Sequence, residues 1–501
     1  MHLIWQSRAD LRRAFDLARP VGQRGLVRWY LANCLGRAGG PPEEPGGREP
    51  QRTGAEWRRP TRNLAGIARQ VSRRLPQPWR RAGKQIALAV AAAHARFMPR
   101  LVRFRSGALL AVAKAGVQRA RNVPGFNLIG HAFSELGLGQ NLRFVAAALR
   151  SAALPYRVVE FSAGVPAARA AMASNSAVRR DNPYDINVFM MSPELLASAC
   201  CVFGQEFFYR QCNVLYAFWE LERWPEPWRE WLDLFDEVWV PTRFVEDSVA
   251  RVAKCPVIRI SPCVSLPAPS AKGRADFGLP AGRFLFLTIV DAFSYLERKN
   301  PLAAVRAFKL AFPSTRQDVG MVIKVMNADS RDAHWRLLVE ECAGDPRFVL
   351  INRVLAFEDM VALYRATDCY VSLHRSEGFG LCMAEAMLCG KPVVATRYSG
   401  NLDFTLPDNS CLVDVQMVPV LPGQYPFAQG QVWAEPDIAQ AAECMRKLRD
   451  DTRAAELMGE QGRQWAMERL GPDRAGVAFS DILGHCGHRL DEAGARFGFR
   501  R

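Results

Sequence analysis

The sequence has no acidic residue between Trp57 and Asn122, although that stretch is rich in arginine. Residues 1–122 carry 25 Lys and Arg against 6 Asp and Glu, whereas the rest of the chain carries 41 against 44. The formal net charge of +16 therefore belongs to the N-terminal quarter. Such a segment favours an anionic partner. We expect residues 57–122 to bind an anionic membrane surface, because basic amphipathic helices bind lipid headgroups.

Nucleic acid is not expected, because no aromatic-and-glycine recognition pattern accompanies this charge. Two alternatives stay open for the basic region: an interaction arm for another protein, and disorder without a role.

Long apolar runs and regular cysteine spacing are also missing. The apolar run Gln85–His94 is too short for a membrane-spanning helix, which needs about 20 residues. Met1–Arg8 lacks a long apolar core, so no signal peptide is expected. The 13 cysteines are odd in number and irregularly spaced, which argues against a disulfide framework and for reduced thiols. We therefore expect a cytoplasmic protein that its basic segment can hold peripherally on the inner membrane.

Two series of short apolar runs alternate with helical patterns after Val123, which is typical of βαβ units and parallel strands. A segment with three prolines, Pro262–Gly273, joins the two series. We predict an α/β chain with two doubly wound, Rossmann-like domains that face one cleft. The expected parts are a basic N-terminal region with helices (1–122) and a disordered linker at about 38–56, a first domain (123–265), a second domain (274–470), and a C-terminal helix with a basic tail (471–501).

Residues 376–387 carry most of the functional information. They follow a strand candidate and pass through two glycines into a helix, with Glu377 before the helix and Glu385 within it. At 1.5 Å rise per residue, the two glutamates lie roughly 10 Å apart along the axis. Backbone N–H groups at such a helix start point at an anion. A nucleotide sugar could therefore place its hexose near Glu377, its diphosphate at the helix start and its ribose near Glu385. The residues expected at that helix start are Gly378, Phe379, Gly380 and Leu381.

This Glu-x7-Glu segment, the preceding Asp368 and the following Gly390–Thr396 resemble glycosyltransferase family 4. Val123–Arg143 resembles the first strand and glycine loop of that family, and Asn213–Val249 resembles bacterial polysaccharide transferases in particular. The resemblance covers roughly Val123 to Arg469. It implies the GT-B fold, with an acceptor-side first domain and a second domain that binds a nucleotide sugar, and a reaction that retains anomeric configuration.

The resemblance also implies roles by position. Glu377 matches the residue that holds the hydroxyls of the donor sugar, and Glu385 the one that binds ribose hydroxyls. Lys299 and Lys324 match the residues that neutralise the diphosphate, and the neighbouring Arg298 is able to help. Further donor contacts are expected from Gly137 and Gly139 in the first glycine loop, and from Asn352 and Arg353 beside the base.

Two positions depart from the family pattern. Ser294 stands where members commonly have Arg, and we take Arg298 as its substitute. Glu220 stands near the place where a His often ends the central strand of the acceptor domain, and we take it as the replacement. On local grounds Lys324 needs an anion or the end of its strand, because it interrupts an apolar run. Lys299 lies in a charged segment, where a solvated side chain is as plausible as a ligand contact.

The resemblance implies a retaining hexosyltransferase that elongates a bacterial surface polysaccharide on a lipid-linked or oligosaccharide acceptor. No metal and no other cofactor are expected, and the short cluster His485–His488 is too small to suggest a metal site. The segment Trp219–Arg223 suggests GDP-mannose as the donor. The alternatives are a non-catalytic scaffold of a polysaccharide-assembly complex and a sugar-nucleotide epimerase. The residues expected to act in catalysis are Glu377, Lys324, Lys299 and Glu220.

Overall fold

The computed structural model describes residues 123–133, 137–161, 181–196, 199, 203, 207–208 and 211–496, with side chains of the last helix described as far as residue 484. The basic region 1–122, its linker and its expected membrane contact lie outside the described residues. So do the side chains of His485–His488 and the end of the basic tail.

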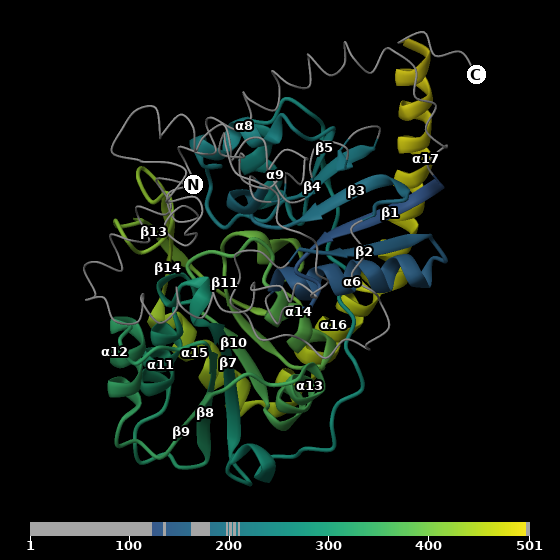
Figure 1. Cartoon of the computed structure of the whole chain (residues 1–501). Helices are drawn as coiled ribbons and strands as arrows, with labels where there is room; N and C mark the ends of the chain where they lie inside the picture. Colours follow the sequence, from purple (N-terminus) through teal and green to yellow (C-terminus); the bar gives the residue numbers. More distant parts are fainter. Residues whose placement is uncertain are drawn as a thin grey trace, which may run out of the picture.

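A six-stranded parallel sheet forms the first half of the described chain, with the strand order β2-β1-β3-β4-β5-β6 (Figure 1). Its strands are β1 (Val123–Gly130), β2 (Tyr156–Glu160), β3 (Tyr184–Met190), β4 (Cys212–Tyr216), β5 (Glu237–Val240) and β6 (Val257–Arg259). Among the described residues, the helices beside this sheet include α6 (Gly137–Ser151), α8 (Arg229–Leu232) and α9 (Arg243–Ala250).

A second six-stranded parallel sheet follows, with the order β12-β11-β10-β7-β8-β9. Its strands are β7 (Phe284–Asp291), β8 (Val319–Met326), β9 (Phe348–Asn352), β10 (Cys369–Ser372), β11 (Val393–Thr396) and β12 (Cys411–Val413). Its helices are α10 (Leu296–Lys299), α11 (Pro301–Ala311), α12 (Ala333–Cys342), α13 (Phe357–Ala366), α14 (Leu381–Leu388), α15 (Ile438–Asp450) and α16 (Thr452–Leu470). Short 3-10 turns lie at Pro193–Leu195, Glu226–Trp228, Ala275–Phe277, Ala292–Ser294 and Gly400–Asp403.

The central strands of both sheets are almost continuously buried, as expected for parallel strands with helices on both faces. The predicted fold class, two doubly wound parallel sheets, is therefore confirmed. The carboxyl ends of the strands are where such sheets bind ligands.

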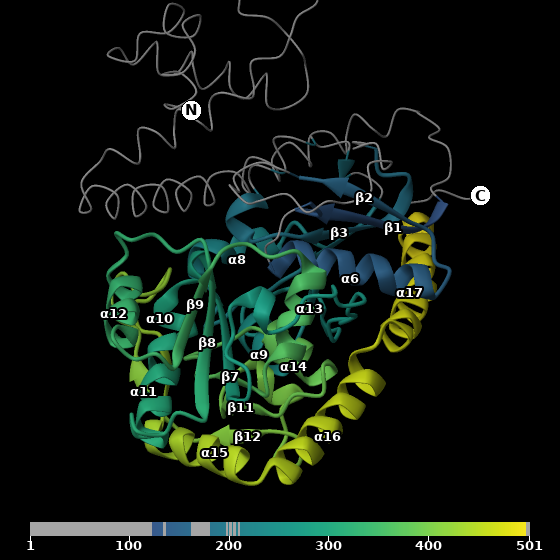
Figure 2. The same cartoon turned by 90° about the horizontal axis from the view of Figure 1, so that it is seen from below.

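The last helix, α17 (Pro472–Arg496), leaves the second sheet and packs on the first (Figure 2). Its Phe479 ring lies 5.8 Å from the ring of Phe126 and 5.8 Å from that of Trp239, measured between centroids. A Cβ at Gly476 would lie 2.8 Å from the Cβ of Ala152, so a small residue is needed where α17 meets α6. The helix predicted after residue 470 thus ties the end of the chain to the first sheet.

Two features were not predicted. An antiparallel hairpin, β13 (Val415–Pro419) with β14 (Val432–Pro436), stands apart from both sheets. Cys411 and Cys444 form a disulfide with a Cα–Cα distance of 6.2 Å, which departs from the expectation of reduced thiols. The two cysteines meet because α15 packs on β12, a contact that their separation of 33 residues does not reveal. The free cysteines of the described residues are Cys212, Cys255, Cys263, Cys342, Cys369, Cys382 and Cys389.

None of the helices in the described part of the chain combines the length and the apolar character that a bilayer crossing requires.

Candidate active site

A cleft of about 680 Å³ lies between the two sheets and is lined by residues of both. Its size suits a nucleotide-sized ligand, because small-molecule sites commonly enclose about 300–1,000 Å³. Most of the residues predicted from the sequence line it. These are Gly137, Glu220, Arg298, Lys299, Lys324, Glu377, Gly378, Phe379, Gly380, Leu381 and Glu385.

Three predicted donor contacts do not reach the cleft lining. Gly139 is buried within α6, two residues after Gly137. Asn352 and Arg353 are exposed where β9 ends. Their successors, Val354 and Leu355, line the cleft instead. After β9 the chain therefore reaches the cleft two residues further along than predicted, at Val354 in place of Asn352.

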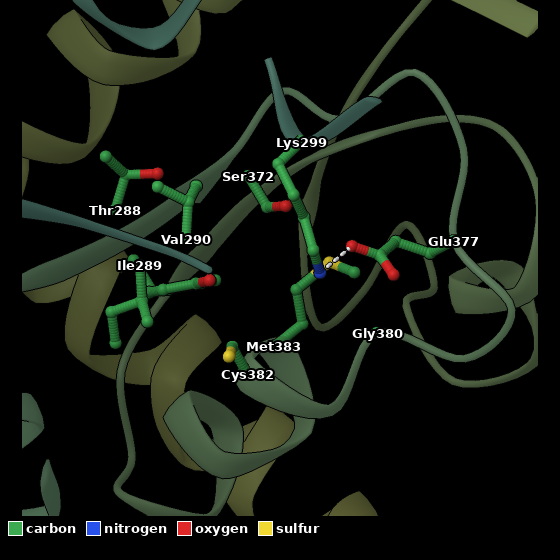
Figure 3. A pocket seen from close by; sticks show the side chains of 10 residues that line it. Thr288, Ile289, Val290, Lys299, Ser372, Glu377, Gly380, Cys382 and Met383 are labelled. Carbon is green, nitrogen blue, oxygen red and sulfur yellow. Dashed lines mark hydrogen bonds and ion pairs between the residues drawn. The ribbon is translucent and has the colours of Figure 1, made fainter. Parts of the chain in front are cut away.

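Glu377 is the centre of a buried ion cluster. Its side chain is 8% exposed, and one carboxylate oxygen, Oε2, accepts a hydrogen bond of 2.9 Å from Nη1 of Arg298. The other oxygen, Oε1, pairs with the ammonium of Lys299. Figure 3 shows the Lys299 side chain passing Ser372 to reach this carboxylate. The solvated alternative for Lys299 is therefore wrong in this structure.

Glu377 is held in its ionised form. Burial alone would raise the pKa of this carboxyl, but the positive charges of Lys299 and Arg298 outweigh it and leave the pKa well below its ordinary value. The Glu377 backbone is fixed as well, because its N–H donates to Oγ of Ser399 over 2.8 Å. Glu377 is therefore a negatively charged side chain in a fixed position, directly before the first glycine of the loop, Gly378.

Arg298 is positioned by the short helix α10. Its Nε donates to the carbonyl of Ser294 at 3.2 Å, and its Nη1 also donates to the carbonyl of Ser376 at 2.8 Å. The helix ends at Asn300, whose φ of 50° lets Pro301 begin α11. The Arg298 side chain is 4% exposed, its Nη1 bridges the carboxylate of Glu377 and the carbonyl of Ser376, and the residue also lines the cleft.

The two glycines of the loop suit it for different reasons: Gly380 for its backbone conformation, and Gly378 for a close approach to the first domain. Gly380 has a φ of 101°, and a Cβ there would lie 2.2 Å from Cε of Met383. A Cβ at Gly378 would lie 3.1 Å from the carbonyl oxygen of Trp219 in the first domain. Met383 and Ala384 donate their backbone N–H groups to the carbonyl of Gly380. The N–H groups of the residues just before them, at the start of α14, therefore have no acceptor within the helix. The positive end of this helix faces the cleft.

Glu385 lies within α14, four residues after its first residue, Leu381, and is 5% exposed. The hydroxyl of Tyr364 donates to its Oε2 at 2.9 Å. Burial raises the pKa of Glu385 to about 7, against the weaker lowering effects of Tyr364, Lys299 and Lys324. Lys324 itself is only 2% exposed and lines the cleft from β8. Glu385 is therefore a carboxyl that titrates near neutral pH beside the cleft.

Three residues at or beside the cleft were missed by the sequence analysis. His374 is fully buried between Ser372 and Asn401, and burial lowers its pKa, so it is a neutral support behind the loop. Asp291 lines the cleft at the end of β7. Tyr425 lines it from the unpredicted hairpin. His374 could have been noticed three residues before Glu377, whereas no local pattern marks Tyr425.

Among the described residues, no group of three or more His, Cys, Asp or Glu side chains gathers as a set of metal ligands.

Part of the chain is similar to known glycosyltransferases. Residues 290–419 match the family model of glycosyl transferases group 1. A D-inositol 3-phosphate glycosyltransferase from Arthrobacter sp. is 33% identical over 139 residues, which cover 27% of this chain and 32% of the relative. The corresponding protein of Corynebacterium jeikeium is 33% identical over 134 residues, covering 26% and 31%. The matched part of the chain thus spans about a third of the length of these curated relatives.

Two solved structures share the fold. Anabaena HepE, in complex with UDP and glucose, aligns with a TM-score of 0.52 at 14% identity over 72% of this chain and all of that chain. Sucrose-phosphate synthase from Thermosynechococcus elongatus aligns with a TM-score of 0.52 at 16% identity over 73% of this chain and 100% of its own. Residues 290–419 therefore resemble the glycosyl transferases group 1 family, in a chain that has the GT-B fold.

Proposed function

We propose that this chain is a retaining glycosyltransferase that moves a hexose from a nucleotide-diphosphate sugar to a lipid-linked or oligosaccharide acceptor in bacterial surface polysaccharide synthesis. The observation that carries the proposal is the ionised Glu377, fixed at the glycine loop and facing a cleft between two parallel sheets. The family match of residues 290–419 and the names of the curated relatives support it.

In this proposal the donor lies along α14. Glu377 accepts hydrogen bonds from hydroxyls of the sugar, the helix start faces the diphosphate, and Glu385 accepts from the ribose hydroxyls. Lys299 carries three N–H donors, so it can serve both Glu377 and a phosphate oxygen. Lys324 supplies a second positive charge from β8.

The leaving diphosphate would be stabilised electrostatically. Lys299, Lys324 and the start of α14 offer preorganised positive charge where negative charge develops. We propose that this charge suffices without a metal or another cofactor. Retention would proceed by attack on the face of the leaving group, so no covalent nucleophile is assigned.

The donor and the location are parts of the same proposal. We propose GDP-mannose as the donor, from the segment Trp219–Arg223, and UDP-glucose is the alternative because HepE was solved with UDP and glucose. We also propose that the protein works in the cytoplasm, held on the inner membrane by residues 57–122.

A thermal-shift screen tests the donor site. The purified chain would be melted with UDP, GDP, ADP, dTDP and their common sugar conjugates. A ligand that binds only the folded state stabilises it by about 2.7 kcal/mol at 100 times its dissociation constant. We expect one nucleoside-diphosphate family to raise the melting temperature, and Glu385→Ala to remove the effect. No shift with any nucleotide would favour the scaffold, and conversion of the donor without an acceptor would favour the epimerase.

Donor binding should tighten as pH rises through neutrality. The raised pKa of Glu385, about 7, means that this side chain is mostly protonated at pH 6 and mostly ionised at pH 8. Only the carboxylate accepts hydrogen bonds from both ribose hydroxyls. We expect about tenfold tighter nucleotide binding at pH 8 than at pH 6, by titration calorimetry. Glu385→Gln should bind weakly and without this pH dependence, and an unchanged profile in that variant would contradict the assignment.

A further inference from the structure

The hairpin arm, residues 415–436, crosses from the second domain to the first. It leaves the second sheet after β12 and returns to it at α15, and its strands β13 and β14 pair only with each other. Its buried residues Tyr425, Ala428 and Trp433 nevertheless belong to the hydrophobic core of the first domain. The arm is therefore part of one domain by sequence and of the other by packing.

Two contacts fasten the arm to the first domain. The ring of Phe427 meets that of Trp228 edge to face, with centroids 4.9 Å apart. Gln431 and Arg223 exchange two hydrogen bonds: the Arg223 N–H donates to Oε1 of Gln431 at 3.3 Å, and Nε2 of Gln431 donates to the Arg223 carbonyl at 2.7 Å. Both contacts come from residues that follow Tyr425 in the chain, and they hold this part of the arm on the first domain.

Tyr425 and its neighbour Pro426 are the residues of the arm that line the cleft, and Tyr425 makes the polar contact there. Its hydroxyl donates to Oε2 of Glu220 at 2.6 Å. Its ring is packed between Tyr295 and Trp219, at centroid distances of 4.9 and 5.7 Å. Burial, followed by the charge of Glu220, raises the pKa of Tyr425 well above its ordinary value, so the hydroxyl remains a donor. Across the Tyr425 ring, the guanidinium of Arg298 lies 5.8 Å from the ring centroid.

Glu220 is thereby oriented by the opposite domain. Tyr425 engages only one of its two carboxylate oxygens, Oε2, and Glu220 itself lines the cleft. Trp228 and Pro426 line the cleft beside this pair. A carboxylate next to aromatic and apolar walls suits a sugar ring, which offers hydroxyl donors at its edge and an apolar face.

Building on the proposed function, we propose that Tyr425 is a positioning residue for Glu220, and that Glu220 accepts a hydrogen bond from a hydroxyl of the carbohydrate acceptor. The hairpin arm then contributes to acceptor specificity. It belongs to the second domain by sequence, yet it fixes the orientation of Glu220 in the acceptor subsite of the first domain. Acceptors whose hydroxyl does not reach Glu220 are bound weakly.

The test is a double-mutant cycle on glycoside binding by the full chain. Methyl α-D-mannopyranoside and methyl α-D-glucopyranoside are titrated by saturation-transfer NMR, with the nucleoside diphosphate from the thermal screen at saturation. We expect one glycoside to bind, and Glu220→Gln and Tyr425→Phe each to weaken it about tenfold. The double variant should be no weaker than Glu220→Gln alone, because Tyr425 acts through that carboxylate.

The control is Tyr398→Phe. The Tyr398 hydroxyl also donates across the domains, to Oε1 of Glu222 at 3.0 Å, but neither residue lines the cleft. This variant should bind the glycoside as the unaltered chain does. Nucleotide affinity should stay within about twofold in all variants, which shows that they fold and keep the donor site.

Losses that add in the double variant would overturn the positioning role. If neither glycoside binds while the nucleotide does, the acceptor subsite is wrong and the donor assignment stands. If no nucleotide binds either, the proposed function itself fails.

Discussion

Glu377→Gln should lower turnover by about 10²–10³-fold, because a neutral amide cannot replace the fixed negative charge that we propose faces the donor sugar. The structure makes this substitution severe for a second reason. Arg298 and Lys299 both pair with the carboxylate in a buried setting, and both would lose their counter-charge. Breaking a buried ion pair on one side costs about 3–5 kcal/mol. We therefore expect a lower melting temperature alongside the loss of turnover, both measured on the same preparation.

The pH dependence of stability should change in the same variant. Since the pKa of Glu377 in the folded chain lies below its ordinary 4.5, its ion pairs stabilise the fold above pH 4.5 and that stability is lost as pH falls further. The Gln variant should lack this component of acid unfolding.

Glu435→Gln is the matched control for Glu377→Gln. It removes a carboxylate that pairs with Arg375 at 2.6 Å, but this side chain is 38% exposed and does not line the cleft. Exposed pairs contribute little, about 0–1 kcal/mol. Turnover in Glu435→Gln should stay close to that of the unaltered chain. Full activity in Glu377→Gln would remove the central role proposed for that residue.

The part of the site that the sequence predicted is the part built from local pattern. Glu377, the two glycines and Glu385 lie on one strand–loop–helix unit, so their order along the chain fixes their order in space. Lys324 was equally visible, because a lysine inside an apolar strand must reach a strand end or an anion.

The rest of the candidate site depends on contacts between segments that are distant in the sequence. Tyr425 reaches Glu220 only because the hairpin arm crosses between the domains, and the two residues are 205 positions apart. Arg298, which we took as the substitute for the arginine missing at Ser294, donates to the Ser294 carbonyl and to the carboxylate of Glu377, a residue 79 positions away. Asn352 and Arg353 are exposed while Val354 and Leu355 line the cleft, because the exact residue at which β9 turns is not encoded in a short-range pattern.

Gly400→Ala should disable the site without touching a ligand. A Cβ at this position would lie 2.2 Å from the carbonyl oxygen of Gly378 and 2.9 Å from that of Glu377. Both are backbone atoms and cannot rotate away. The Gly400 N–H also donates to the Glu377 carbonyl at 2.9 Å, so the added methyl pushes directly on the loop that carries the carboxylate.

The expected effect is large because catalysis depends on placement. Overpacking of this kind costs about 1–3 kcal/mol, and a displacement of about 1 Å in a catalytic group can cost about 100-fold in rate. We expect Gly400→Ala to lower the melting temperature by a few degrees and turnover by about 100-fold. The φ of Gly400 lies outside the left-handed region that favours glycine. An alanine can therefore adopt this backbone, and the effect isolates the steric contact.

Gly273→Ala separates this contact from the general effect of replacing a glycine. A Cβ at Gly273 meets no heavy atom of the described residues within 4 Å, and its φ is also outside the left-handed region. Stability and turnover should both be unchanged in Gly273→Ala. If Gly400→Ala were equally silent, the Glu377 loop could move aside at no cost. Catalysis would then not depend on the exact position of that carboxylate, because a loop that yields freely to a methyl group cannot hold a transition state in place.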